Sequence, residues 1–375
     1  MHGLTETIML HIILRRAAVP VTAALLALTG FWVGAGYLPG RAAQPKNAGL
    51  IYSVAVPIPV TLAKASGAPR LREALVSIRK AIPAVSVVHL TVDQGVTSEA
   101  DWLALLDAVR AERFRASVAF VERADDDGGN YTGVRPTPAG AGWRTGSLGV
   151  FAACAKCVAH PALYAVQVVD DPWHHSKRPF YTTAELQDLI DYLKSRSPGA
   201  ARVRWFVQFS RGLWKQAQDP PRPDTIWEGG LGEIVQISAL EFQDRQYQFV
   251  LLDQNHYWSR RIIHDKTPQI PLWTSVQVMG ARYGPAAGYW FPRERDGQRD
   301  LLRLLNDLLA TKYQTEHPLA GLMFQQWDSV SEARRTQQYT LGDRHLKNQP
   351  QSQVEASDDA LRTINAWIRG AGVAR

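Results

Sequence analysis

The sequence predicts an α/β protein that folds as a single (β/α)8 barrel of the TIM type, with long loops at the carboxyl-terminal face of its strands. Two observations support this fold. Eight short apolar runs alternate with longer segments whose apolar residues recur at helical spacing, which is the pattern of repeated strand–helix units. The runs are nearly continuous in hydrophobicity, as expected for strands covered on both faces. An open doubly wound sheet usually has fewer strands, so their number favours a closed barrel.

The apolar runs give the expected strands. Each run is rich in Val, Ile, Phe or Tyr, and most are followed by polar residues. In chain order the expected strands are Ile51–Val56, Val85–Val92, Arg115–Val121, Leu163–Val169, Val203–Phe209, Ile234–Ala239, Pro271–Val278 and Ala320–Gln325.

The segments between the runs give the expected helices and loops. Thr182 and Glu185 form a capping-box pattern, which predicts that a helix begins there. The expected helical segments are Leu71–Ile82, Trp102–Val109, Thr182–Leu193, Asp244–His264, Arg299–Tyr313 and Asp358–Ile368. Three further segments are expected to be long loops, namely Arg123–Trp143, Arg282–Gly297 and Asp328–Ala356.

Residues 1–48 differ from the rest of the chain and are expected to direct export. The pair Arg15-Arg16 precedes an uncharged stretch, Ala17–Gly40, and small residues follow it. This order is typical of a cleaved secretory signal peptide, and the stretch is also long enough for a transmembrane anchor. Both alternatives leave residues 49–375, the expected barrel domain, secreted or periplasmic, with attachment to the inner membrane in the second case.

The formal net charge of +7 favours anionic neighbours such as a membrane surface or an acidic sugar. Basic residues are scattered among acidic ones, and their clusters are pairs such as Arg260-Arg261 and Arg334-Arg335. A nucleic-acid-binding protein normally concentrates its basic residues on one face or helix. We therefore expect no nucleic-acid partner, and we expect the chain to act as a monomer.

The two cysteines, Cys154 and Cys157, are spaced as C-x-x-C. In an oxidising compartment they could close a small disulfide loop, and otherwise they could remain as buried thiols in a helix. A zinc site would need a second pair of ligands, which this motif lacks. We expect neither a metal nor another cofactor.

The residues that follow each apolar run are the candidates for chemistry, because the active site of a TIM barrel lies at the carboxyl ends of its strands. Acidic and aromatic residues are frequent there. Carboxylates supply acid–base catalysis and aromatic rings stack on sugar faces, so the pattern predicts a carbohydrate site. The strand-end residues are Asp93, Glu122, Asp170, Asp171, Arg211, Glu241, Gln277, Trp327 and Asp328.

The segment Tyr164–Trp173 reads Tyr-Ala-Val-Gln-Val-Val-Asp-Asp-Pro-Trp and resembles the fourth-strand segment of TIM-barrel glycoside hydrolases. In that family the strand ends in Asp-Glu-Pro or Asn-Glu-Pro, and the Glu is the acid/base. Pro271–Gln277 is similar to the seventh-strand segment of hydrolase-like barrels with the same motif. The resemblance covers roughly residues 160–328 and rests on short motifs. It implies a barrel that acts on a poly- or oligosaccharide without a cofactor.

Two positions depart from the family pattern. Asp171 stands where the relatives have the acid/base Glu, and Gln277 stands where retaining relatives keep a nucleophilic Glu. An amide cannot attack an anomeric carbon. The resemblance therefore implies an inverting hydrolase with Asp171 as general acid and a base drawn from Asp328, Glu241 or Asp93.

The pair Asp170-Asp171 has two interpretations. Adjacent carboxylates before Pro172 raise the pKa of one of them, which suits a general acid. The same pair could instead cap the next helix or bind a nearby arginine.

Substrate contacts are expected from residues near the strand ends. Aromatic rings would stack on the sugar or, alternatively, pack at the rim. Arg211 would suit an acidic saccharide, although an exposed arginine is usually only solvated. The candidate substrate-binding residues are Asp93, Trp173, His174, Arg211, Gln277, Tyr283 and Trp327.

Two other functions fit parts of the sequence. Gln277 favours a non-catalytic envelope protein whose degenerate glycosidase barrel binds or guides an exported polysaccharide. Leu90–Gly95 is similar to the opening of polysaccharide deacetylases. In this chain, however, Gln94 replaces the second Asp of that motif, and no His-x-x-x-His pair follows it to hold the metal.

Overall fold

The computed structural model describes most of the expected barrel domain, and every structural statement below refers to the described residues. Residues 1–48, the expected signal or anchor, lie outside them. No helix in the described part of the chain combines the length and apolar character needed to cross a membrane. The described residues are 49–58, 64–93, 98–123, 130–132, 147–170, 172–173, 181–209, 227–239, 256–278, 280–281, 295–309, 311–325, 327, 338–339, 341–342, 344 and 351–370.

Eight parallel strands form a closed barrel, which confirms the predicted fold class. The first strand pairs with the second on one side and with the last on the other, so the sheet has no free parallel edge. Each strand lies within two residues of its predicted bounds. The barrel strands are β1 (Ile51–Ile58), β2 (Val85–Asp93), β3 (Arg115–Arg123), β5 (Leu163–Asp170), β6 (Trp205–Phe209), β7 (Ile234–Ala239), β8 (Leu272–Gln277) and β10 (Gly321–Gln325).

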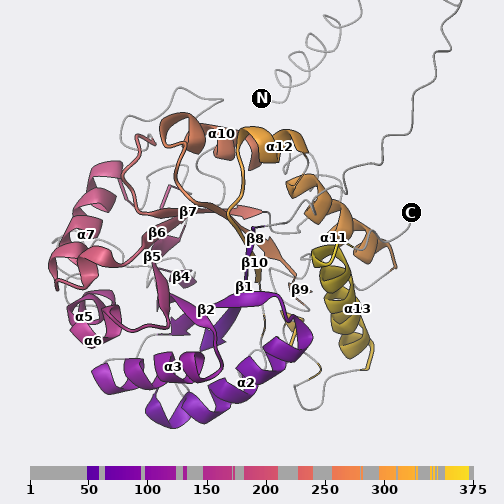
Figure 1. The fold of residues 1–375 in the computed structure, drawn as a ribbon, viewed down its shortest axis with the longest axis horizontal. Helices are drawn as coiled ribbons and strands as arrows, with labels where there is room; N and C mark the ends of the chain where they lie inside the picture. Colours follow the sequence, from indigo (N-terminus) through magenta and orange to yellow (C-terminus); the bar gives the residue numbers. More distant parts are fainter. Residues whose placement is uncertain are drawn as a thin grey trace, which may run out of the picture. The chain divides into compact units, whose positions relative to one another are not determined.

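Helices form an outer layer around the strands (Figure 1). Their outer position follows from their amphipathic sequences; in the first long helix, for example, Leu71, Leu75 and Ile78 are almost fully buried. The helices are α2 (Ala68–Ala81), α3 (Glu99–Ala111), α5 (Ser147–Ala153), α6 (Ala155–Val158), α7 (Thr183–Ser195), α10 (Tyr257–Lys266), α11 (Arg295–Leu308), α12 (Thr311–Glu316) and α13 (Gln351–Ile368), with 3-10 turns η1 (Ala65–Gly67) and η2 (Ala200–Arg202).

The predicted helices are present where they fall on described residues, with several differences, and residues 244–255 of the expected helix Asp244–His264 lie outside the described residues. The capping box at the start of α7 is present, because Thr182 and Glu185 exchange side-chain to backbone hydrogen bonds. The short helices α5 and α6 were not predicted, and neither was the break between α11 and α12. The predictions that residues 282–297 and residues 328–356 each form one loop are wrong, because α11 begins at Arg295 and α13 begins at Gln351.

Three short strands lie outside the barrel pattern. β4 (Asn130–Thr132) extends the sheet by antiparallel pairing with β3. β9 (Gly280–Ala281) and β11 (Gln338–Tyr339) form a separate antiparallel pair. β4 and β11 lie inside segments that the sequence predicted to be loops, whereas β9 directly precedes the predicted loop Arg282–Gly297.

The two cysteines form a disulfide between Cys154 and Cys157. Cys154 is the N-cap of α6, and its Sγ also accepts a hydrogen bond from the backbone nitrogen of Cys157 at 3.1 Å. Both residues are buried. Of the two alternatives left by the sequence, the structure therefore has the small disulfide loop.

Large aromatic residues close the amino-terminal end of the barrel. The ring of Tyr164 lies 5.6 Å from that of Trp273, and the guanidinium groups of Arg115 and Arg204 lie 4.5 and 5.0 Å from the Tyr164 ring. Such contacts combine apolar burial with cation–π attraction. Access to the barrel interior from this end is therefore blocked by packed side chains.

Gly321, at the start of β10, makes room for the Trp273 ring. A Cβ at this position would lie 2.5 Å from two ring carbons of Trp273, well inside van der Waals contact. Only a residue without a side chain fits there unless the ring moves. The close approach explains why a glycine begins this buried strand.

We predict that Gly321→Ala lowers the free energy of unfolding by about 1–3 kcal/mol, because the new methyl group overpacks the barrel floor. Urea unfolding of both proteins measures the change. In a Trp273→Phe background the smaller ring leaves space, so the same substitution should cost less. Equal costs in both backgrounds would show that the Trp273 ring is not the obstacle.

Candidate functional site

The carboxyl ends of the barrel strands bring three of the predicted site residues to one rim. β2 ends at Asp93, β5 ends at Asp170 and β8 ends at Gln277. The backbone register pairs Asp93 with Val121 of β3 and Asp170 with Gln208 of β6. Because all eight strands are parallel, these ends lie at the same end of the barrel.

The remaining polar candidates stay predictions. The side chains of the three strand-end residues above are outside the described part of the structure. Six further candidates lie outside the described residues with both backbone and side chain, namely Asp171, His174, Arg211, Glu241, Tyr283 and Asp328. The structure therefore places the start of the rim, and it does not test the roles assigned to these residues.

Two of the predicted sugar platforms are buried aromatic residues. Trp173 is 6% exposed and its ring lies 4.8 Å from that of Phe209. Trp327 is fully buried, and its backbone nitrogen donates a hydrogen bond to the carbonyl of Ala55 at 2.8 Å. This burial favours the packing interpretation for both rings, because a stacking platform needs one open face.

Below the rim, the barrel interior is polar. Barrel interiors are normally filled with bulky branched side chains. Here seven of the eight strands place a polar side chain, at most 6% exposed, inside the barrel. These residues are Ser53, His89, Ser117, Gln167, Gln208, Gln236 and Ser275.

Some members of this polar layer bind one another. Gln236 Nε2 donates to Gln208 Oε1 at 2.8 Å, which links β7 to β6. His89 Nδ1 and Ser117 Oγ lie 3.1 Å apart, which links β2 to β3. The layer lies directly under the rim, so it forms the floor of any site built there.

His89 and Ser117 resemble a nucleophile–base pair only in their spacing. The cavity that they line is about 10 Å³, measured as the space open to the centre of a water molecule. No sugar or acyl group fits in that volume. The pair is therefore not a site for covalent catalysis.

The polar layer was not predicted, because each apolar run was taken to be apolar on both of its faces. The signal was present in the sequence. In Arg115–Arg123, Leu163–Asp170 and Trp205–Phe209 a single polar residue (Ser117, Gln167 or Gln208) interrupts the apolar stretch at a position that faces inward. Such an interruption in a doubly covered strand marks a polar barrel interior.

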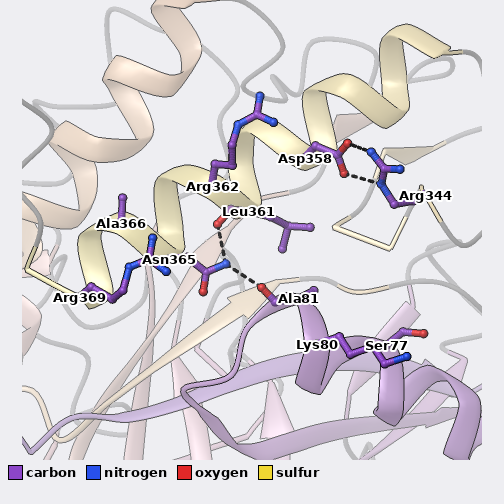
Figure 2. A pocket seen from close by; sticks show the side chains of 10 residues that line it. All are labelled: Ser77, Lys80, Ala81, Arg344, Asp358, Leu361, Arg362, Asn365, Ala366 and Arg369. Atoms are coloured by element: carbon purple, nitrogen blue, oxygen red, sulfur yellow. Dashed lines mark hydrogen bonds and ion pairs between the residues drawn. The ribbon is translucent and has the colours of Figure 1, made fainter.

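A second hollow lies on the flank of the barrel, between α2 and α13, and measures about 740 Å³ (Figure 2). Its lining includes four cations, but these have ordinary structural roles. Arg344 binds Asp358, and Arg362 binds Asp359. Lys80 and Arg369 occupy the last turn of α2 and the end of α13, where a positive charge offsets the helix dipole.

The flank hollow also lies far from the rim. Helices of a (β/α)8 barrel run from the carboxyl end of one strand back to the amino end of the next. The hollow is lined by the later turns of α2 and α13, where Asn365 Nδ2 donates to the carbonyls of Ala81 and Leu361 (Figure 2). The rim is therefore the better candidate site.

Among the described residues, no three His, Cys, Asp or Glu side chains are grouped in a way that could hold a metal ion.

Comparison with known proteins adds information on the fold. No protein-family model and no curated protein matches the sequence. An exo-β-1,4-mannosidase from Opitutaceae bacterium strain TAV5 is 8% identical with a TM-score of 0.53, over 85% of this chain and 59% of that chain. A glycoside hydrolase family 5 enzyme from Prevotella bryantii B14 is 12% identical with a TM-score of 0.42, over 77% and 86% of the two chains.

A further similar structure is the cellulose synthase subunit Z from Clostridioides difficile, at 7% identity and a TM-score of 0.49, over 84% of this chain and 99% of that chain. TIM-barrel glycoside hydrolases are thus among the structural neighbours of the chain. At these identities the similarity to the mannosidase shows a shared barrel fold and no more.

The environment of His89 makes stability depend on pH. Burial lowers the pKa of His89 from 6.5 to about 4, and the Gln167 side chain opposes only part of this shift. The unfolded chain therefore takes up a proton at this residue at higher pH than the folded chain. The free energy of unfolding is therefore unaffected by His89 above about pH 6.5, where the imidazole is neutral in both states. It decreases as the pH falls toward about 4, because the unfolded chain is then protonated at His89 and the folded chain is not.

We predict that His89 alone lowers the free energy of unfolding by about 3 kcal/mol between pH 6.5 and 4, because the unfolded chain is protonated at this residue in that range. Urea unfolding across this window should show a smaller loss in His89→Asn than in the wild-type chain. The pKa values of His256, His264 and His317 are also lowered by burial, so they add the same slope to both proteins. Identical slopes would contradict the buried neutral state of His89.

Proposed function

We propose that the chain is an exported glycoside hydrolase-like protein that acts on a poly- or oligosaccharide at the carboxyl-end rim of its barrel. One observation carries this proposal. β5 ends at Asp170 on the rim, so the next residue in the chain is the candidate general acid, Asp171. The ends of β2 and β8 add Asp93 and Gln277 at the same rim, and the fold is shared with a mannosidase.

The proposed reaction is hydrolysis with inversion. Asp171 donates a proton to the leaving glycosidic oxygen, while a second carboxylate takes a proton from the attacking water on the opposite side of the sugar. The base is drawn from Asp328, Glu241 or Asp93. An inverting pair needs a gap of roughly 6.5–9.5 Å to hold that water, wider than a retaining pair.

Substrate binding is assigned to the polar and aromatic residues of the rim. Because Trp173 and Trp327 are buried, the ring expected to stack on the sugar is that of Tyr283. His174 and Gln277 would supply hydrogen bonds to hydroxyl groups, and Arg211 would suit the carboxylate of an acidic sugar.

Asp171→Asn tests the proposal. We predict that it lowers kcat by at least about 100-fold on any polysaccharide that the wild-type chain hydrolyses, because an amide cannot protonate the leaving group. Reducing-sugar release from a panel of neutral and acidic polysaccharides measures the effect. Asp188→Asn, on the exposed face of α7, is the matched control and should leave kcat unchanged. Unchanged turnover in Asp171→Asn would remove this residue from the mechanism.

A second candidate function is polysaccharide binding without turnover, which Gln277 at the end of β8 favours. It predicts saturable binding by isothermal titration calorimetry with no reducing ends released. It also predicts that Asp171→Asn changes only the affinity for the polysaccharide, because there is no turnover to lose. The two functions are therefore separated by product formation.

Export is the second part of the proposal. The disulfide between Cys154 and Cys157 supports it, because such bonds persist mainly in oxidising compartments. We predict that residues 1–48, fused to a reporter phosphatase that is active only after its own disulfides form, give activity in a bacterial host. A fusion that begins at residue 49 should give none. Equal activity of the two fusions would contradict export through this segment.

A further inference from the structure

A small cavity lies inside the barrel, among the polar layer under the rim. About 10 Å³ of it is open to the centre of a water molecule. Strands from around the barrel contribute to its wall. The lining residues are Ser53, His89, Ser117, Tyr164, Ala165, Phe206, Ile234, Gln236, Trp273 and Met323.

Two polar groups in this wall have no protein partner among the described residues. They are the hydroxyl of Ser53 on β1 and the indole nitrogen Nε1 of Trp273 on β8. Ser53 is fully buried and Trp273 is 4% exposed, so bulk water does not reach them. A buried donor or acceptor without a partner is strongly disfavoured, and a bound ligand is one way to satisfy it.

The wall determines the class of ligand. Its titratable side chains are His89 and Tyr164, and no Asp, Glu, Lys or Arg side chain lines the cavity. Burial keeps the His89 imidazole neutral, so one ring nitrogen can accept a hydrogen bond and the other can donate one. A charged ligand would have no counterion, and the volume admits about one water molecule.

We propose that this cavity binds one long-lived water molecule that hydrogen-bonds to Ser53 and Trp273. The water accepts a hydrogen bond from Trp273 Nε1 and forms one further hydrogen bond with the Ser53 hydroxyl, which can donate or accept. The wall contains four further polar side chains that could complete the shell of this water, namely His89, Ser117, Tyr164 and Gln236. Buried waters typically make about three such bonds.

The cavity also touches two hydrogen-bonded pairs that the protein forms on opposite sides of the interior, because His89, Ser117 and Gln236 line it. His89 and Ser117 link β2 to β3, and Gln236 and Gln208 link β7 to β6. The water adds β1 and β8 to this network. Polar contacts beneath the rim then involve six of the eight strands, and this role is independent of any activity at the rim.

A crystal structure of the chain at about 1.5 Å resolution, together with thermal unfolding of Ser53→Ala, tests this inference. We expect density for one water in contact with Ser53 Oγ and Trp273 Nε1. We also expect Ser53→Ala to lower Tm by roughly 2–4 °C, because the water loses a partner. If the cavity were dry, removal of an unpaired hydroxyl would raise Tm instead.

Ser357→Ala is the matched control, because Ser357 is also fully buried and its hydroxyl donates to the carbonyl of Leu341 at 3.0 Å. It should lower Tm by a similar amount and leave the barrel density in place. Absence of density in the wild-type cavity would overturn the inference, and so would a rise in Tm for Ser53→Ala.

Discussion

The closure of the sheet by β1 is the constraint on which the other features depend. β1 pairs with β2 and with β10, so each of the eight strands has two parallel neighbours. Because every neighbouring pair in the closed sheet is parallel, all eight strands run in one direction and their carboxyl ends lie in a single rim. Closure also creates an interior that is sealed at the other end by Tyr164 and Trp273. A site on this chain can thus be approached from the rim and not from below.

The two faces of the barrel strands differ in polarity. The outward faces of the strands pack against helices in an apolar core, in which Trp102 contacts both Phe120 and Phe151. The inward faces carry serine, histidine and glutamine instead. Such a floor costs stability unless its groups are paired, and hydrogen bonds across strands together with the proposed water satisfy part of it. A polar floor also suits a rim that handles hydroxyl-rich ligands.

The sequence was sufficient for the barrel because eight apolar runs and a clear capping box carry strong local signals. It was not sufficient for α5 and α6, whose short Ala- and Cys-containing turns lack helical periodicity, or for the start of α13, where Gln351–Glu355 is polar. At the site, strand ends such as Asp93 and Asp170 were correctly expected at one rim because chain direction determines their position. Burial of Trp173 and Trp327 depends on contacts with residues distant in sequence, such as Phe209, and could not be read from composition.

The central claim is that the rim at the ends of β2, β5 and β8 is where this chain meets a saccharide. A crystal structure of Asp171→Asn in complex with an oligosaccharide fragment of the polysaccharide that binds best tests it most directly. We expect the sugar to occupy the rim, with a glycosidic oxygen within hydrogen-bond distance of the side chain at position 171. A sugar bound in the flank hollow between α2 and α13, or one at the rim but remote from position 171, would contradict the account.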